Sequence, residues 1–144
     1  MRTLLLSAVA VMGLSLMPAD AQQPAMTAVA TVSQLHDAII SPASDAIFRV
    51  GSQAPTTDQE WQALRNSAVM LAEAGNLLMI GRRARDQRAW VKLSRGLTDA
   101  GAAALKAAMS KDLEAVNRAS DQLIDVCESC HTPYRDGGRT MPKQ

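Results

Sequence analysis

Aromatic residues and net charge are both scarce in this sequence. Two tryptophans, one tyrosine and one phenylalanine occur among its 144 residues, and the formal net charge is +1. A nucleic-acid-binding surface needs a surplus of basic residues to neutralise phosphates, so this balance argues against a nucleic-acid partner. The sequence shows no phosphate-binding loop, acid/base pair or activated-nucleophile pattern either, and it therefore predicts a protein that is not an enzyme.

Long apolar runs are absent except at the N-terminus. Arg2, the apolar run Leu4–Met17 and the small-x-small sequence Ala19-Asp20-Ala21 together indicate an export signal that is cleaved near Ala21. The run is short for a helix that crosses a bilayer, which disfavours the alternative of an uncleaved anchor. We therefore expect residues 1–21 to be a signal peptide.

The rest of the chain is long enough for one compact unit. We expect a single domain at residues 22–135, because about this length supports one core. Residues 136–144, which open with Gly137-Gly138, are expected to form a flexible tail.

The strand pattern of alternating apolar and polar residues is also absent, and apolar residues recur instead at helical spacing. The first predicted helix spans Val32 to Val50 and contains Pro42. Pro42 either kinks this helix or occupies the first position of a second short helix capped by Ser41.

Three further helices follow with short connections. A capping box, Thr57-Asp58-Gln59-Glu60, predicts the start of the second helix, which should end near Ile80-Gly81. The basic turn Arg82–Arg85 leads to the third, and Ser110 is expected to cap the fourth. The predicted fold is therefore all-α, an antiparallel four-helix bundle.

The predicted core has few large side chains. The third helix is dominated by alanine and glycine along Gly96–Ala108, so the bundle must either fill that space or collapse upon it, and a large flat apolar cofactor would fill it. The expected core residues include Trp61, Trp90, Met70, Met79 and Met109.

Only two cysteines occur, and both lie in the sequence Cys127-Glu128-Ser129-Cys130-His131. This is C-x-x-C-H, the attachment signature of c-type haem. Two thiols at this spacing add to the two vinyl groups of one porphyrin, and the adjacent imidazole then becomes an axial ligand of the iron. Helical spacing places both cysteines on the inward face of the fourth helix. The cofactor that we expect is one covalently attached haem c.

Other roles for the two cysteines fit less well. A structural zinc site needs four ligands, whereas only three cluster here and His36 is remote in sequence. A thiol–disulfide redox motif is typical of a helix N-terminus, but these cysteines lie near a helix C-terminus. A plain disulfide three residues apart closes a small loop and stabilises little, although a haem-free disulfide bundle stays open as an alternative.

The ending "CESCHTPYR", residues 127–135, resembles that of the class II c-type cytochromes, the cytochrome c′ group. The segments "SPASDAIF" and "EWQALRNSAVMLAEAGNLLM" are similar to the first and second helices of related bacterial cytochromes. The resemblance implies that Cys127 and Cys130 carry the haem thioethers, that His131 is the proximal iron ligand, and that Arg135 lies alongside the proximal face. Pro133 departs from a plain helical ending, and we expect the helix to stop at His131 with Thr132 outside helical geometry.

The iron's sixth position separates two functions in that group. An empty position allows the iron to bind small gases such as nitric oxide, whereas a methionine from the first helix gives an electron carrier. The first helix has no methionine but has His36, a candidate second ligand, and the alternative is that His36 is simply solvated. Met26 could reach the iron only if the N-terminal segment folds over, and a position away from the site is the stronger interpretation.

The conspicuous charge cluster is Arg82, Arg83, Arg85 and Arg88. It is either a solvated loop or a docking surface for an acidic redox partner. Together with the resemblance, these features predict a periplasmic haem protein that carries single electrons between periplasmic or membrane-bound redox proteins. The alternative is a gas-binding haem protein with a vacant sixth position, and dimerisation through an apolar face stays open.

Overall fold

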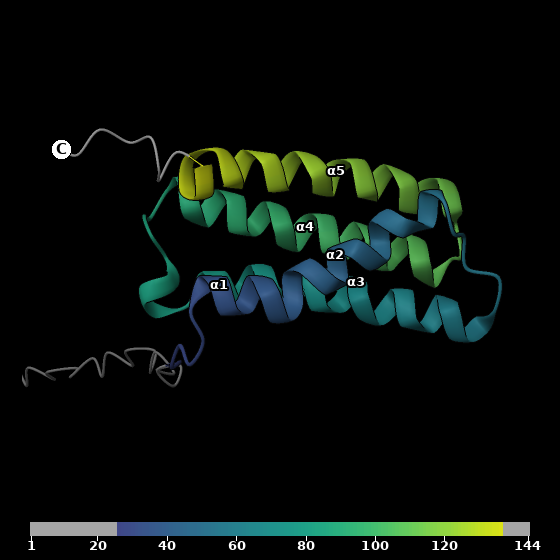
Figure 1. Cartoon of the computed structure of the whole chain (residues 1–144), viewed down its shortest axis with the longest axis horizontal. Coiled ribbons are helices and arrows are strands. Elements are labelled where there is room, and N and C mark those ends of the chain that lie inside the picture. Colours follow the sequence, from purple (N-terminus) through teal and green to yellow (C-terminus); the bar gives the residue numbers. More distant parts are fainter. Residues whose placement is uncertain (1–25, 137–144) are drawn as a thin grey trace, which may run out of the picture.

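The computed structural model describes residues 26–136, and over this range it contains helices and turns but no strand. The helices form a four-helix bundle, as the sequence predicted (Figure 1). The predicted signal peptide, residues 1–21, and residues 137–144 of the predicted tail lie outside the described range. No helix within residues 26–136 has both the length and the apolar character that crossing a membrane requires.

The first helix of the bundle is continuous but changes its winding. It comprises α1 (Val32–Leu35), a π-helical turn (His36–Ile40), α2 (Ser41–Phe48) and a 3₁₀ turn (Arg49–Gly51). The backbone N–H of Ser41 donates to the carbonyl of His36, five residues earlier, and Ser41 has helical φ and ψ angles. Ser41 therefore does not cap a separate helix, and of the two interpretations of Pro42 the interrupted single helix is correct.

Pro42 lies two residues after this wider turn, with Ser41 between them. A proline ring in a helix clashes with the carbonyl four residues earlier and offers no N–H donor. A π-turn next to the proline changes the spacing at that point, and such turns are common at functional sites. The first helix begins with a capping box, in which Thr31 Oγ1 accepts from the N–H of Gln34 and Gln34 Oε1 accepts from the N–H of Thr31.

The second helix, α3 (Asp58–Leu78), starts at the predicted capping box. Thr57 Oγ1 accepts from the N–H of Glu60 at 3.2 Å, and Glu60 Oε2 accepts from the N–H of Thr57 at 2.9 Å. Hydrogen bonds that the Glu60 carboxylate accepts, first from the N–H of Thr56 and then from the N–H of Thr57 and the hydroxyl of Thr56, lower the pKa of Glu60 to about 2. A 3₁₀ turn (Gly81–Arg83) and a loop then lead to α4 (Ala89–Met109).

The fourth helix, α5 (Leu113–His131), is capped by Asp112, whose carboxylate accepts from the N–H of Ala115 at 2.9 Å. The prediction that Ser110 caps this helix is wrong. The hydroxyl of Ser110 donates instead to the carbonyls of Lys106 and Ala107, at the end of α4. A short turn reverses the chain between the two helices, and Lys111 adopts φ 55° in it.

The alanine- and glycine-rich part of α4 is closely packed. A Cβ added at Gly101 would lie 2.8 Å from Cα of Ala72 on α3, and one added at Gly75 would lie 2.5 Å from the carbonyl oxygen of Ser94 on α4. Small residues thus let α3 and α4 approach until their backbones nearly touch. The sequence predicted that the space along Gly96–Ala108 is either filled or closed by the helices. The helices close it.

The structure confirms some of the predicted core residues and contradicts others. Trp61 and Trp90 are buried as predicted, with 6% and 2% of their surfaces exposed. Met70 and Met109 are 40% and 68% exposed, so the prediction that they fill the core is wrong. Their positions on α3 and α4 point away from the closely packed seam, which alanine and leucine fill.

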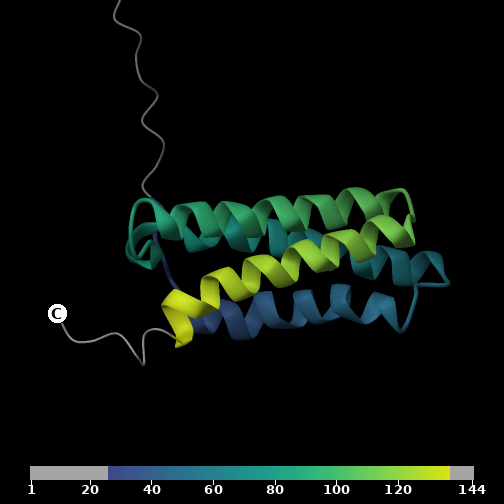
Figure 2. The ribbon, with the colours of Figure 1, turned by 90° about the horizontal axis from the view of Figure 1, so that it is seen from above.

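Figures 1 and 2 show how the four helices run alternately up and down, so that the start of the first helix, the loop before α4 and the end of α5 lie at one end of the bundle. The α2–α3 and α4–α5 connections lie at the other. Residues far apart in the sequence therefore meet at the first end.

Candidate functional site

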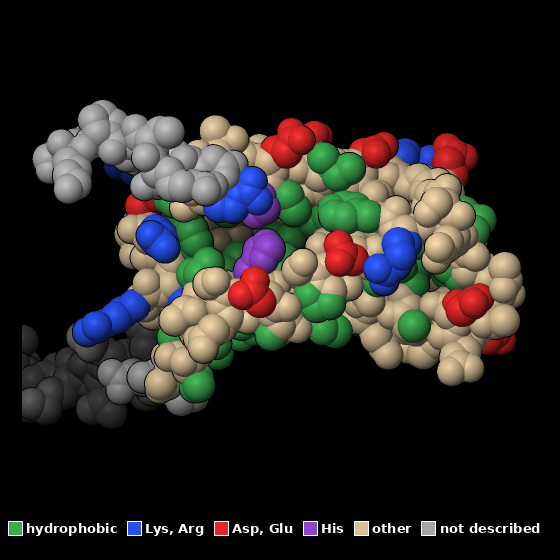
Figure 3. Space-filling model, viewed as in Figure 1, with side chains coloured by type: hydrophobic (Ala, Val, Ile, Leu, Met, Phe, Trp, Pro, Cys, Tyr) green, Lys and Arg blue, Asp and Glu red, His purple; other side chains and the backbone are tan. Residues whose placement is uncertain are grey.

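A cavity of about 470 Å³ lies at that end, between α1 and its π-turn, the start of α4 and the end of α5. Figure 3 shows the two histidine side chains on either side of a hollow with apolar side chains around it. Its volume is within the usual range for cofactor and ligand sites, about 300–1,000 Å³. Its apolar lining comprises Val32, Ile40, Leu78, Trp90, Leu93, Leu97 and Val126.

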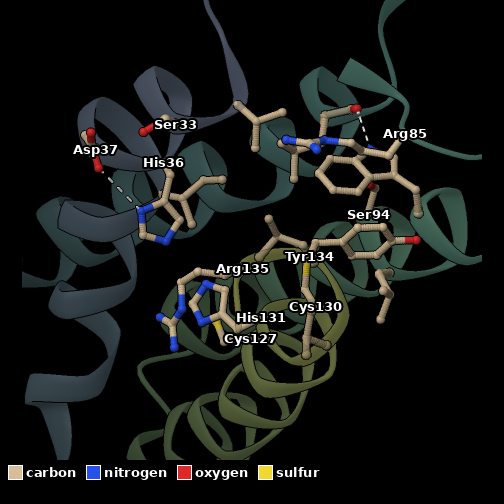
Figure 4. Close-up of a pocket in the computed structure, with 17 residues that line it drawn as sticks. Ser33, His36, Asp37, Arg85, Ser94, Cys127, Cys130, His131, Tyr134 and Arg135 are labelled. Atoms are coloured by element: carbon tan, nitrogen blue, oxygen red, sulfur yellow. Dashed lines mark hydrogen bonds and ion pairs between the residues drawn. The ribbon is translucent and has the colours of Figure 1, made fainter. Parts of the chain in front are cut away.

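Cys127, Cys130 and His131 all line this cavity from the last turns of α5 (Figure 4). The two cysteines are half-buried and are not joined by a disulfide. Burial raises the pKa of both thiols, and for Cys127 the nearby Cys130 and Glu128 raise it further. The predicted inward placement of the cysteines is therefore correct, and both thiols are held in their neutral form.

His36 lines the same cavity from the opposite side. Its imidazole faces that of His131, with the ring centroids 5.6 Å apart and the planes inclined at 50° (Figure 4). Asp37 is next to it, with 3.7 Å between His36 Nδ1 and Asp37 Oδ1. The structure thus brings together the two histidines, which are 95 positions apart in the sequence.

The π-turn contributes to this arrangement. His36 is its first residue, immediately after the buried Leu35. One additional residue in a turn rotates the preceding part of a helix by about 100° relative to the part after the turn, since an α-helix has 3.6 residues per turn. The widened turn therefore sets the direction in which α1 presents His36 relative to the well-packed α2.

Arg135 also lines the cavity, and Figure 4 shows its guanidinium beside the imidazole of His131. It belongs to a second π-helical turn, Thr132–Asp136. The α-helix does end at His131 as expected, but Thr132 has φ −53° and ψ −55°, so the prediction that it leaves helical geometry is wrong. As at Pro42, a wider turn accommodates the proline, and Asp136 is helical rather than part of a tail.

Met26 does not reach the site. It is 69% exposed and is not among the residues that line the cavity. Of the candidate axial ligands considered from the sequence, the cavity therefore holds His131 and His36.

Asp86 is a residue that the sequence interpretation missed. One of its carboxylate oxygens accepts from the backbone N–H groups of Arg88, Ala89 and Trp90, and the other accepts from the hydroxyl of Tyr134. These hydrogen bonds, led by that of Tyr134, lower the pKa of Asp86. Asp86 lies two positions before Arg88, the N-cap residue of α4, and not at the N-cap, where a capping aspartate is expected, so no local pattern indicated its role.

The basic cluster divides into two parts. Arg83 is buried, and its guanidinium donates to the carbonyls of Ala30 at 2.7 Å and Leu77 at 2.8 Å. It therefore ties the N-terminal segment to the end of α3 and is neither solvated nor available for docking. Arg82, Arg85 and Arg88 are exposed, and Arg85 lines the cavity.

The donors at this site fit a haem better than a bare metal ion. Two neutral thiols three residues apart, two facing imidazoles and predominantly apolar walls suit a flat apolar macrocycle with an iron that takes nitrogen ligands. In the described part of the chain no three histidine, cysteine, aspartate or glutamate side chains converge as a metal-binding group.

Comparison of the chain with protein-family models, with curated proteins and with solved structures finds no match in any of the three.

Proposed function

We propose that this protein is a haem c electron carrier related to the class II c-type cytochromes. The observation that carries the proposal is the meeting of Cys127, Cys130 and His131 with His36 across one apolar cavity. The attachment motif alone would favour a haem. The facing histidine favours electron transfer, because it would supply a second nitrogen ligand to the iron.

Each of these residues has a role in the proposal. Cys127 and Cys130 would hold the haem through thioether bonds, and His131 and His36 would supply nitrogen ligands to its iron. When bound, the haem supplies a one-electron Fe(III)/Fe(II) couple. The surrounding apolar side chains exclude water, and two imidazoles in place of an imidazole and a thioether lower the reduction potential.

The second imidazole also distinguishes the proposal from gas binding. A haem iron with both axial positions occupied by protein ligands binds a gas only after one ligand leaves. His36 lies in a helix that is anchored by the buried Leu35 before it and Ile40 after it. We therefore place gas binding second.

A partner follows from the distribution of charge. Residues 81–95 contain six basic residues and one acidic residue in a chain whose formal net charge is +1. Five of the six are exposed, and within the described residues none of the five forms an ion pair: Arg82, Arg85, Arg88, Lys92 and Arg95. This basic surface borders the cavity, so an acidic redox protein would be steered to the place where electron transfer is shortest.

The proposal also includes the cellular compartment in which the protein works. The predicted export signal at residues 1–21 supports a location in the bacterial periplasm, where thioether attachment to an exported chain would occur.

The attachment is tested by the mass of the purified mature protein, produced with haem-attachment machinery. The proposal expects a mass higher than that of the polypeptide by one haem, retained after denaturation. Replacing either thiol, by Cys127→Ala or Cys130→Ala, should leave one thioether, and the double variant should lose the haem on denaturation. A mature wild-type chain with the polypeptide mass alone would contradict the proposal.

The basic surface is tested by the rate at which the reduced protein is oxidised by an anionic complex, hexacyanoferrate(III). This rate should fall with salt, and should fall several-fold in Arg82→Glu/Arg88→Glu. The matched control, Arg49→Glu/Lys106→Glu, makes the same change of charge away from the cavity and should alter the rate much less. Equal losses in both variants would show that net charge, not this surface, governs the encounter.

A further inference from the structure

Tyr134 connects the C-terminal turn to the start of α4. It lies in the second π-turn, three residues after His131, and its hydroxyl donates to Asp86, 48 positions away in the sequence. Its ring meets Trp90 edge-on, with the centroids 4.8 Å apart and the planes at 84°. A hydrogen bond to a carboxylate and an edge-to-face aromatic contact therefore act on one side chain.

Asp86 is itself fixed in place. The oxygen that does not contact Tyr134 accepts from three successive backbone N–H groups at 2.7 to 3.1 Å, at the start of α4. A carboxylate at this position is further stabilised by the positive end of the helix. One side chain thus uses one oxygen to cap α4 and the other to hold the turn after α5.

Trp90 provides a rigid surface for the tyrosine ring. It is 2% exposed, and its indole N–H donates to the carbonyl of Leu78 at 2.8 Å, at the end of α3. Tyr134 therefore rests on a residue fixed to α3 and α4 together.

We propose that Asp86 and Tyr134 form a latch that holds the last turn of the chain against the start of α4 and so positions His131 opposite His36. In this view Tyr134 and Asp86 are positioning residues, since they act on the iron ligand through the backbone between residues 131 and 134. The latch also closes one wall of the cavity, because Trp90 and Tyr134 both line it (Figure 4). The consequence for an iron ligand rests on the proposed haem function, whereas the latch does not.

The latch is tested by hydrogen exchange of the backbone amides of Thr132 and of residues 134–136 in the purified mature protein; Pro133 has no amide hydrogen. Tyr134→Phe keeps the ring on Trp90 and removes the hydroxyl. Asp86→Asn keeps a side-chain oxygen for the cap and removes the charge. We expect either change to speed exchange of these amides about tenfold, and the double variant to be no faster than the faster single variant, because both changes remove one interaction.

Asp112→Asn is the matched control. Asp112 caps α5 as Asp86 caps α4, but it has no tyrosine partner. This variant should leave exchange of the amides of Thr132 and of residues 134–136 unchanged. Wild-type exchange in both latch variants, or effects that add in the double variant, would overturn the latch.

A second readout tests the positioning of His131. In reduced holoprotein, carbon monoxide must displace an axial imidazole, and we expect Tyr134→Phe to speed this displacement several-fold while Asp112→Asn does not. Faster amide exchange with an unchanged rate of carbon monoxide binding would overturn the positioning role. If the purified protein carries no haem but shows the expected exchange pattern, the haem proposal is contradicted and the latch is retained.

Discussion

Two regions of the bundle differ in how closely the helices pack. Along the seam between α3 and α4, a Cβ added at Gly101 or at Gly75 would strike the backbone of the facing helix. Toward the first helix and α5, α4 instead presents Trp90, Leu93 and Leu97 to a cavity of about 470 Å³. The seam fixes α3 and α4 relative to each other, and the cavity lies beside this rigid pair. Both π-turns lie at the cavity end, and each has a proline within it or two residues beyond it.

This comparison indicates how a sequence with few large side chains supports a binding site. Alanine and glycine bring α3 and α4 together along their seam, and the larger residues at the start of α4 line the cavity. The π-turns then adjust the directions of His36 and of the segment after His131 without disturbing the packed seam. The rigid contact and the open space thus lie on different sides of the same helix.

The largest expected effect comes from adding a side chain at the α3–α4 seam. Gly101→Ala places a Cβ against the backbone of Ala72, so the helices must separate, and we expect a loss of about 3 kcal/mol in the free energy of unfolding. Gly96→Ala is the control on the same helix, because its Cβ meets only the side chain of Val126, at 3.3 Å. Denaturant unfolding should show a change of about 1 kcal/mol or less for Gly96→Ala. Equal losses would contradict the contrast between the seam and the side of α4 that faces α5.

The next effect concerns the first π-turn. If Pro42 makes the wide turn necessary, Pro42→Ala should allow an ordinary α-helical turn, which rotates His36 out of the cavity while the chain stays folded. In the holoprotein, the expected result is a large loss of the low-spin spectrum with unfolding stability equal to or above that of the wild type. An unchanged spectrum would mean that packing, not the proline, maintains the turn.

Alkaline titration tests the latch without any cofactor. The hydrogen bond to Asp86 raises the pKa of Tyr134 to about 12, from an ordinary value of 10. A raised pKa in the folded state means that the latch contributes its full stability below pH 10 and loses it as the pH rises toward 12. Tyr134 is the only tyrosine in the chain, so tyrosinate absorbance reports it directly. In Asp86→Asn the midpoint should move down toward 10, and a wild-type midpoint near 10 would contradict the latch.

The smallest expected effect separates two residues at the α4–α5 turn, at the end of the bundle away from the cavity. Asp112→Ala should cost about 1 kcal/mol, because the N–H groups at the start of α5 lose their cap. Ser110→Ala removes only hydroxyl bonds to carbonyls at the end of α4 and should cost a few tenths of a kcal/mol. Thermal unfolding of the two variants distinguishes them, and the reverse order would restore Ser110 as the cap.

Much of the fold can be predicted from local signals in the sequence. The capping box at Thr57 fixes the start of α3 because its two hydrogen bonds involve residues three apart, and helical spacing alone places Cys127 and Cys130 inward. The bundle itself is expected from four such segments with short connections.

The features that the sequence did not reveal depend on residues distant in the chain. The collapse of α4 onto α3 requires Gly101 to meet Ala72, and no local pattern states that pairing. The role of Asp86 depends on Tyr134, and the burial of Arg83 depends on the carbonyl of Ala30. A proline marks an interruption, but only the tertiary structure decides that a π-turn resolves it.

The most direct test of the central claim is the absorption spectrum of the purified holoprotein, oxidised and reduced, with and without carbon monoxide, beside that of His36→Ala. Iron held between His131 and His36 predicts a low-spin wild type that resists carbon monoxide and a high-spin variant that binds it readily. A wild type that is already high-spin and binds the gas at once would contradict the axial pair and make gas binding the better account of the cavity.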